Sequence, residues 1–307
     1  MASGPTQLCS HEVDGLRKRS AHPTLSTISV DNARSKVVLM PIDEYTLSSF
    51  PVYAKSDGQE ISTATGFLYR YFDCVYLVSN WHVFSGRRPS DGSALDQHYR
   101  VPHNLDITLH YARFQRSLGQ QAMFSKRINI SLDSGWLQHP VFGQDVDVAV
   151  KKLDVRPLYR KQQQNGINLV CINDLRNDEF MLPQVGEDVF IIGFPMKISW
   201  AGSLPIWKRG SIATEYSLNY RNKKSFLVDS TTKDGMSGSP VIMRSSSFMR
   251  TNGSSQMAGP PSTRFLGIYS GRELRHDDQD TQLGLVWKKE YVIETIVGNK
   301  AGDFLVR

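Results

Sequence analysis

Cysteine is scarce in this sequence, and its few copies are not placed for a metal site or a disulfide framework. Cys9, Cys74 and Cys171 are spread over 307 residues without a C-x-x-C pair. That spacing excludes a zinc knuckle and a small disulfide-rich scaffold. Unpaired thiols are typical of a reducing compartment, so the sequence predicts a cytoplasmic protein.

A long hydrophobic run is absent as well. The first 20 residues contain no apolar segment of the signal-peptide type. No later stretch approaches the length that crosses a bilayer. We therefore expect a soluble protein that is not exported and has no membrane partner.

Extended runs of basic residues are also missing, although the formal net charge is +6. Lys and Arg occur in groups of two or three, such as Arg17-Lys18-Arg19 and Lys223-Lys224. Nucleic acid binding requires several cations gathered on one face, and it would show as an affinity that falls steeply with salt. We expect a solvated basic surface and no nucleic acid partner.

Short apolar or alternating runs, separated by turn residues, fill most of the chain from Val37 onward. They cover residues 66–71, 75–78, 105–111, 147–150, 189–192, 225–228, 240–243 and 264–269. Helical spacing does not recur between these runs, which excludes repeated βαβ units and predicts an all-β barrel or sandwich. Residues 288–297 do have helical spacing, and Gly298 is expected to cap that helix.

Changes in composition divide the chain. Residues 1–35 are rich in Ser, Thr, Arg and His, which predicts a flexible extension. Residues 154–184 are polar and predict a linker between two β units, at 36–153 and 185–307. Residues 245–263 are rich in Ser, Gly and Pro and predict a long exposed loop.

Ser237 is the first candidate for chemistry. It lies between glycines in Asp234-Gly-Met-Ser-Gly-Ser-Pro240, directly before an apolar run. A serine that attacks a carbonyl needs preorganised donors for the oxyanion, worth about 2.7 to 4 kcal/mol for one donor. We expect the N–H groups of Gly235 and Ser237 to be those donors. On this segment alone, a plain Ser/Gly turn is an equal alternative.

A serine hydroxyl also needs a base, and the base needs an acid to orient it. His82 ends a strongly apolar run and is favoured over His139, whose position before a proline indicates packing. Asp147 begins a buried run, where a carboxylate is costly unless it is hydrogen-bonded, for example to an imidazole. We therefore favour Asp147 over Asp145, which we interpret as a surface acid.

The order His82, Asp147, Ser237 along the chain is that of the chymotrypsin group. Further matching segments are Thr65-Gly-Phe-Leu68, Ile192-Gly-Phe-Pro195 and Lys208-Arg-Gly-Ser-Ile212. Over about residues 64–298 the chain resembles a trypsin-like serine peptidase, closest to bacterial intracellular glutamyl-endopeptidase-like and HtrA-like members. The resemblance implies two six-stranded antiparallel β-barrels and a C-terminal helix, with His82 and Asp147 on the first barrel and Ser237 on the second.

The resemblance also implies a serine endopeptidase that acts on a polypeptide substrate without a metal or cofactor. Ser237 would attack the peptide carbonyl, His82 would serve as base and then acid, and Asp147 would orient the imidazole. The alternative is a catalytically silent fold that binds a peptide or protein. Met236 stands where animal trypsins carry the aspartate that pairs with a new N-terminus, so activation by that ion pair is not expected.

By position in the family, the specificity pocket contains Thr231, Thr232 and Tyr269, and the substrate backbone pairs with Ser270 and Gly271. Trypsins have an acid where this chain has Thr231, so a preference for Arg or Lys is not expected. The Tyr269 hydroxyl could bond a polar substrate side chain, or its ring could fill the pocket and admit small residues only.

Overall fold

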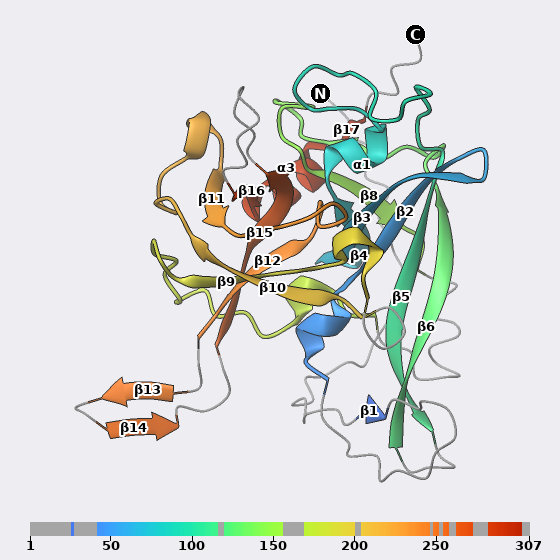
Figure 1. Ribbon diagram of the computed structural model, residues 1–307. Helices are drawn as coiled ribbons and strands as arrows, with labels where there is room; N and C mark the ends of the chain where they lie inside the picture. Colours follow the sequence, from blue (N-terminus) through green and yellow to red (C-terminus); the bar gives the residue numbers. More distant parts are fainter. Residues whose placement is uncertain are drawn as a thin grey trace, which may run out of the picture.

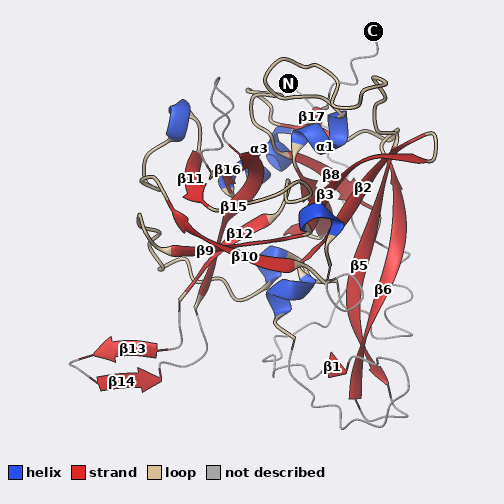
Figure 2. Cartoon of the chain, in the orientation of Figure 1, coloured by secondary structure: helices blue, strands red, loops and turns tan. Residues whose placement is uncertain are grey.

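The computed structural model describes residues 26–27, 42–115, 120–155, 169–199, 204–245, 248–251, 254–257, 262–272 and 282–302. Within these residues β-strands dominate (Figure 2). No helix in these ranges is long and apolar enough to cross a membrane. The expected flexible extension, residues 1–35, lies outside the described residues except for Ser26 and Thr27.

A nine-stranded sheet forms the first half of the fold, in the order β1-β6-β5-β2-β3-β4-β8-β7-β17. Its strands are β1 (Ser26–Thr27), β2 (Ser49–Ser56), β3 (Gln59–Tyr71), β4 (Cys74–Ser79), β5 (Asn104–Gln115), β6 (Gln120–Ser131), β7 (Leu137–Gln138), β8 (Ala149–Leu153) and β17 (Lys300–Ala301). All neighbours are antiparallel except β1 and β6.

This sheet differs from the closed six-stranded barrel expected for the first half. Strand β2 pairs with both β3 and β5, but β6 and β8 are not paired within the described residues, so the sheet stays open there. One reason is that β5 and β6 form a long hairpin that runs away from the rest of the sheet (Figure 1). The other is that the free edge of β8 is taken by β7.

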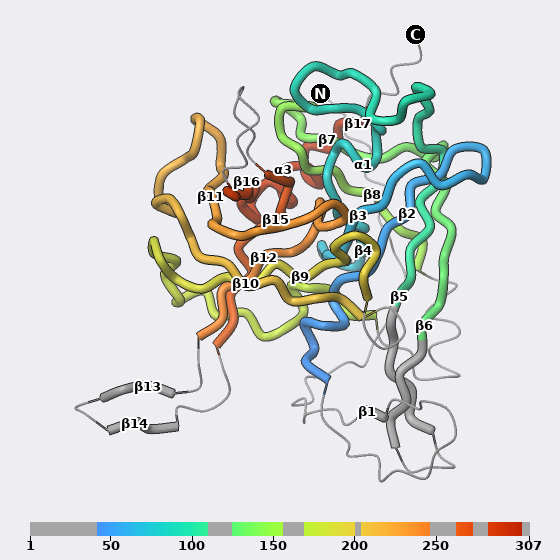
Figure 3. Tube along the Cα trace, viewed as in Figure 1, coloured from blue at the N-terminus to red at the C-terminus, as the bar shows by residue number. Residues whose placement is uncertain are grey.

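A closed barrel forms the second half, in the order β10-β11-β16-β15-β12-β9. Its strands are β9 (Asp188–Gly193), β10 (Ile206–Ile212), β11 (Ser225–Asp229), β12 (Pro240–Arg244), β15 (Thr263–Arg272) and β16 (Leu283–Lys288). Figure 3 shows this barrel beside the first sheet. The predicted all-β class is confirmed, and a closed barrel of six antiparallel strands together with a second sheet is consistent with the predicted two-barrel arrangement.

Buried apolar side chains explain why the two halves pack together. One cluster fills the first sheet and another the second barrel, while a third contains residues from both halves. In this third cluster the ring of Phe67 on β3 lies edge-on to that of Phe265 on β15, with centroids 5.6 Å apart. Burial of such surfaces stabilises the arrangement by about 25 cal/mol per Å² of apolar area.

The helical elements are short: α1 (Trp81–Ser85), α3 (Glu290–Gly298) and the 3₁₀ turns η1 (Glu44–Leu47), η2 (Ile172–Asp174), η3 (Pro195–Lys197) and η4 (Tyr220–Asn222). The predicted C-terminal helix is α3, but its cap is not Gly298. Asn299 takes the left-handed cap conformation, with φ 47°. Gly298 is the last residue of the helix, and glycine is needed there because a Cβ would overlap the ring of Pro140.

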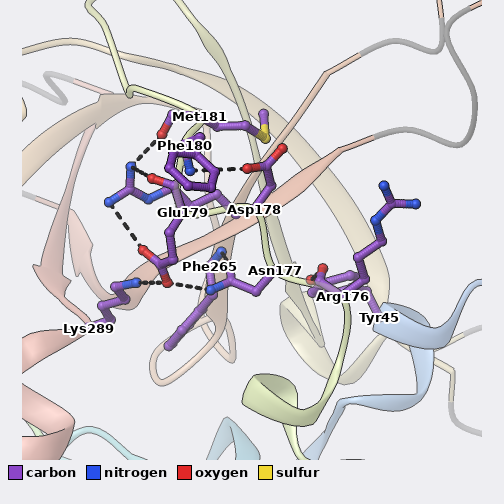
Figure 4. A network of polar contacts seen from close by, with 10 residues as sticks. Tyr45, Arg176, Asn177, Asp178, Glu179, Phe180, Met181, Phe265 and Lys289 are labelled. Carbon is purple, nitrogen blue, oxygen red and sulfur yellow. Dashed lines mark hydrogen bonds and ion pairs between the residues drawn. The ribbon is translucent and has the colours of Figure 1, made fainter. Parts of the chain in front are cut away.

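Part of the predicted linker is held against the second barrel, as Figure 4 shows. The Asn177 side chain accepts a hydrogen bond of 2.8 Å from the N–H of Phe265, and Glu179 forms an ion pair with Lys289. Tyr45, from the start of the first half, donates to the carbonyl of Arg176 at 2.6 Å. Residues 156–168 of the predicted linker lie outside the described residues.

The predicted loop at 245–263 contains a two-stranded hairpin, β13 (Phe248–Thr251) and β14 (Ser254–Met257). Figure 1 shows this hairpin projecting from the second barrel. Its two strands are antiparallel and pair over four consecutive residues, from Phe248 opposite Met257 to Thr251 opposite Ser254.

Candidate active site

His82 is placed by the short helix α1, which follows β4 directly. Asn80 is the N-cap in extended conformation, and His82 lies in the first turn. The neighbouring side chains of Trp81, Val83 and Phe84 are buried in the core of the first sheet, which fixes the helix. The imidazole itself keeps 18% of its surface exposed, so one edge can reach solvent or a substrate.

Asp147 lies just before β8 with only 3% of its side chain exposed. Its Oδ2 is 2.8 Å from His82 Nδ1, and its Oδ1 accepts the His82 backbone N–H at 2.9 Å. The Ser270 hydroxyl donates to Oδ2 at 2.5 Å, and the Asn80 side chain donates to the Asp147 carbonyl at 2.7 Å. The contacts from His82 and Ser270 offset the cost of burying the carboxylate, while Asn80 holds the backbone of Asp147.

The tautomer of His82 follows from these contacts. An ionised carboxylate can only accept hydrogen bonds, so the proton on the Nδ1 side belongs to His82. In a neutral imidazole Nε2 then carries no proton and can act as a base.

Ser237 lies in the turn between β11 and β12, with left-handed glycines on both sides. Gly235 has φ 91° and Gly238 has φ 84°. A Cβ at Gly238 would overlap the Thr65 carbonyl and the Ser79 hydroxyl, so this position requires glycine. The half-buried Ser237 Oγ donates a long hydrogen bond of 3.4 Å to the Ser270 carbonyl.

The backbone of this turn presents two donors. Among the described residues, the N–H groups of Gly235 and Ser237 have no intramolecular acceptor. The carbonyl of Asp234 instead accepts the N–H of Met196, at 2.6 Å. Two unpaired N–H groups in one turn can bind an oxyanion.

Residues 64–248 match the family model of the trypsin-like peptidase domain, and this stretch is more than half of the 307 residues. The chain belongs to the trypsin-like peptidase domain family. No curated protein matches the sequence.

Solved structures with a similar backbone trace share little sequence identity with this trypsin-like peptidase domain. A serine endoprotease from Yersinia pestis shares 14% identity at a TM-score of 0.46, over 84% of this chain and 66% of that one. The active form of the Rv3671c protease from M. tuberculosis shares 13% identity at a TM-score of 0.43, over 90% of this chain and 96% of that one. The chain thus spans slightly less than two thirds of the Yersinia protein.

Family position predicted a pocket at Thr231, Thr232 and Tyr269, and the structure separates these residues into two environments. Thr232 and Tyr269 are buried, and their hydroxyls share a hydrogen bond. The Tyr269 ring lies against Gly284 of β16, where any Cβ would overlap it. Thr231 is exposed and donates to the side-chain oxygen of Gln282 at 3.1 Å.

Ser270 and Gly271 lie on β15 beyond the point where its pairing with β12 ends, at Ile268. The β15–β16 register shifts between Tyr269 and Gly271, which places Ser270 in a bulge. Such an edge is suited to accept an additional strand.

The two rival residues lie elsewhere. Asp145 is 59% exposed at its side chain and forms an ion pair of 3.2 Å with Lys223. His139 is buried, and its Nδ1 accepts two backbone N–H groups while Nε2 lies 3.1 Å from Glu294. Burial opposes ionisation of Glu294, but hydrogen bonds from Lys224 and His139 outweigh it, so the pKa of Glu294 is lowered.

Two contacts of Asp147 escaped the sequence analysis. Ser270 was expected to contribute its backbone only, and Asn80 was not considered. Their side chains lie 123 and 67 positions from Asp147 in the sequence. The available signals were that Ser270 was already selected for its backbone and that Asn80 lies two residues before His82.

Proposed function

We propose that this trypsin-like peptidase domain is a serine endopeptidase that works by acyl transfer. The observation that carries the proposal is the buried Asp147 carboxylate, 2.8 Å from His82 Nδ1. It supports a neutral imidazole whose Nε2 accepts the Ser237 proton when the hydroxyl turns from its 3.4 Å contact with the Ser270 carbonyl.

In the proposed reaction the Ser237 oxygen attacks the peptide carbonyl, and His82 takes the proton from Ser237. The N–H groups of Gly235 and Ser237 then stabilise the oxyanion. His82 donates the proton to the leaving amine, which yields an acyl-Ser237 ester, and water hydrolyses this ester with His82 again as base. Asp147 holds the imidazole and stabilises its protonated form.

The substrate we propose is a polypeptide in extended conformation. Its backbone would add to the open edge of β15 at Ser270 and Gly271, where strand pairing with β12 has ended. Met236 is fully buried in the second core, so an apolar anchor holds the nucleophile turn where animal trypsins use an ion pair. Control by a new N-terminus is therefore not part of the proposal.

For the residue before the cleaved bond, P1, we propose a small side chain. The Tyr269 ring is only 1% exposed, and its hydroxyl is engaged by Thr232. Of the two roles considered for Tyr269, filling the pocket therefore has the better support. Thr231 offers no carboxylate to a basic P1 residue.

Digestion of a peptide library, with the cleaved bonds identified by mass spectrometry, tests both proposals. We expect cleavage after Gly, Ala or Ser, and Ser237→Ala protein serves as the control for contaminating peptidases. A folded protein that binds peptides without cutting them would instead favour the silent binding module.

In the same library, Tyr269→Val should shift cleavage toward larger apolar P1 residues by about tenfold or more, since a single methylene group in a hydrophobic pocket is worth about 10- to 200-fold. Thr231→Val is the matched control, because Thr231 is exposed and should leave P1 preference unchanged. An unchanged P1 profile for Tyr269→Val would show that the ring does not limit the pocket.

A further inference from the structure

Thr65 connects the first sheet to the turn that holds the nucleophile. It lies within β3 and is fully buried. Its backbone N–H donates to the carbonyl of Ser237 at 2.8 Å, and its hydroxyl donates to the carbonyl of Gly235, also at 2.8 Å. One residue of the first half therefore contacts both residues whose N–H groups face the proposed oxyanion, Ser237 through its backbone and Gly235 through its side chain.

The Thr65 hydroxyl is used in both directions. While it donates to Gly235, its oxygen accepts the N–H of Phe194 at 3.2 Å. The Thr65 carbonyl also accepts the Ser79 hydroxyl at 2.7 Å, and Ser79 lies three residues before His82. Hydrogen bonds of Thr65 thus connect the turn that contains Ser237 with the strand that leads to His82.

Gly235 needs such an external constraint. Without a Cβ, and with φ 91°, its backbone has wide conformational freedom, so steric contacts with its own side chain cannot fix the direction of its N–H. The Gly235 N–H and the Asp234 carbonyl belong to one planar peptide group and point in opposite directions. Met196 holds that peptide through the Asp234 carbonyl at 2.6 Å, and Thr65 holds the next one through the Gly235 carbonyl.

We propose that Thr65 is a positioning residue for the oxyanion hole: its hydroxyl fixes the peptide after Gly235 and so keeps the Gly235 N–H directed at the oxyanion. This inference rests on the proposed acyl transfer by Ser237. Thr65 does not touch the reacting atoms. Its contribution is realised in the transition state, because the oxyanion exists only there.

Thr65→Val tests the proposal, since valine preserves the shape of threonine but neither donates nor accepts. We expect kcat to fall about 10- to 100-fold, which is less than the 10²- to 10³-fold typical for removal of a donor, because the donor is displaced and not removed. KM should change by less than about twofold. Thr65→Ser keeps the hydroxyl and should restore kcat to within about threefold of wild type.

A peptide boronic acid gives a second readout, because it forms a tetrahedral adduct on Ser237 and places an oxygen in the oxyanion hole. For Thr65→Val its affinity should fall by the same factor as kcat, while the affinity of the unreactive product peptide stays unchanged. A merely structural role would weaken both ligands together.

Thr295→Val is the matched control. Thr295 is fully buried in α3, and its hydroxyl has no hydrogen-bond partner among the described residues. We expect wild-type kcat and boronate affinity. If thermal unfolding shows that Thr65→Val is not folded, Thr65→Ser and Thr65→Cys provide the comparison. Because a thiol is a weak donor, we expect kcat of Thr65→Cys to be about tenfold lower than that of Thr65→Ser.

Wild-type kcat and boronate affinity in folded Thr65→Val would overturn the proposal. An equal loss of boronate and product affinity would overturn it as well. A wild-type protein that neither hydrolyses peptides nor binds the boronic acid at Ser237 would instead refute the proposed function on which the inference rests.

Discussion

Replacing Asp147 with asparagine should lower kcat by about 10⁴ and leave the protein folded. The asparagine oxygen can still accept the backbone N–H of His82, which Asp147 now accepts at 2.9 Å. Its amide nitrogen, however, donates, so it favours the imidazole tautomer with the proton on Nε2. Nε2 then cannot take the proton of Ser237. Steady-state hydrolysis of the best peptide from the library measures the loss.

Asp145→Asn is the control for this substitution, because it makes the same chemical change two residues away. The Asp145 side chain is 59% exposed and contacts Lys223, at 3.2 Å. An exposed ion pair of this kind is worth about 0 to 1 kcal/mol. We expect kcat within about twofold of wild type and a small change in the free energy of unfolding. If Asp145→Asn were the inactive variant and Asp147→Asn the active one, the assignment of the acid would be wrong.

The second large effect is expected for Gly235→Ala. A Cβ at Gly235 would overlap the carbonyl oxygen of Phe194, and the residue has φ 91°. The turn must then move, which displaces the Gly235 N–H from the oxyanion. We expect kcat to fall about 10²- to 10³-fold, the cost of losing one oxyanion donor. Single-turnover kinetics with an activated ester measures the acylation step directly.

Gly58→Ala separates this steric effect from backbone strain. Gly58 also has a positive φ, of 79°, but no atom lies within 4 Å of a Cβ built there. Its substitution should cost about 1 kcal/mol of unfolding free energy through strain alone and leave kcat unchanged. Equal losses of activity in Gly58→Ala and Gly235→Ala would mean that strain, and not the position of the N–H group, is responsible.

The strands were predictable because their signal is local. Each of the apolar runs between 66 and 269 overlaps a strand of the structure. Whether each sheet closes into a barrel was harder to predict from the sequence, since closure depends on which strand edges remain unpaired. Strand β7, only two residues long, takes the edge of β8 and gives no periodic signal.

The C-terminal cap of α3 shows that residue type alone does not predict which residue caps a helix. Gly298 was a reasonable cap by residue type, but it is needed at a tight contact with Pro140, and Asn299 tolerates the left-handed conformation. That contact joins segments far apart in the sequence. No local pattern reports it.

In the candidate site, too, some residues could be predicted from local sequence and others could not. Asp147 could be preferred over Asp145 because a charge at the start of a buried strand needs partners. The hydroxyls of Ser270 and Thr65 gave no comparable signal, since serine and threonine are ordinary in strands. Their partners become visible only when the second barrel lies against the first sheet. The cytoplasmic location, the domain limits and the absence of nucleic acid binding stay predictions.

Labelling with a peptide phosphonate that reacts with activated serines tests the central claim most directly. We predict a single adduct, located on Ser237 by mass spectrometry of the digested protein, which forms in the wild type and is lost in His82→Ala. A folded, unlabelled wild type would contradict the claim. So would labelling of Ser237 at the same rate in His82→Ala, because the hydroxyl would then react without its proposed base.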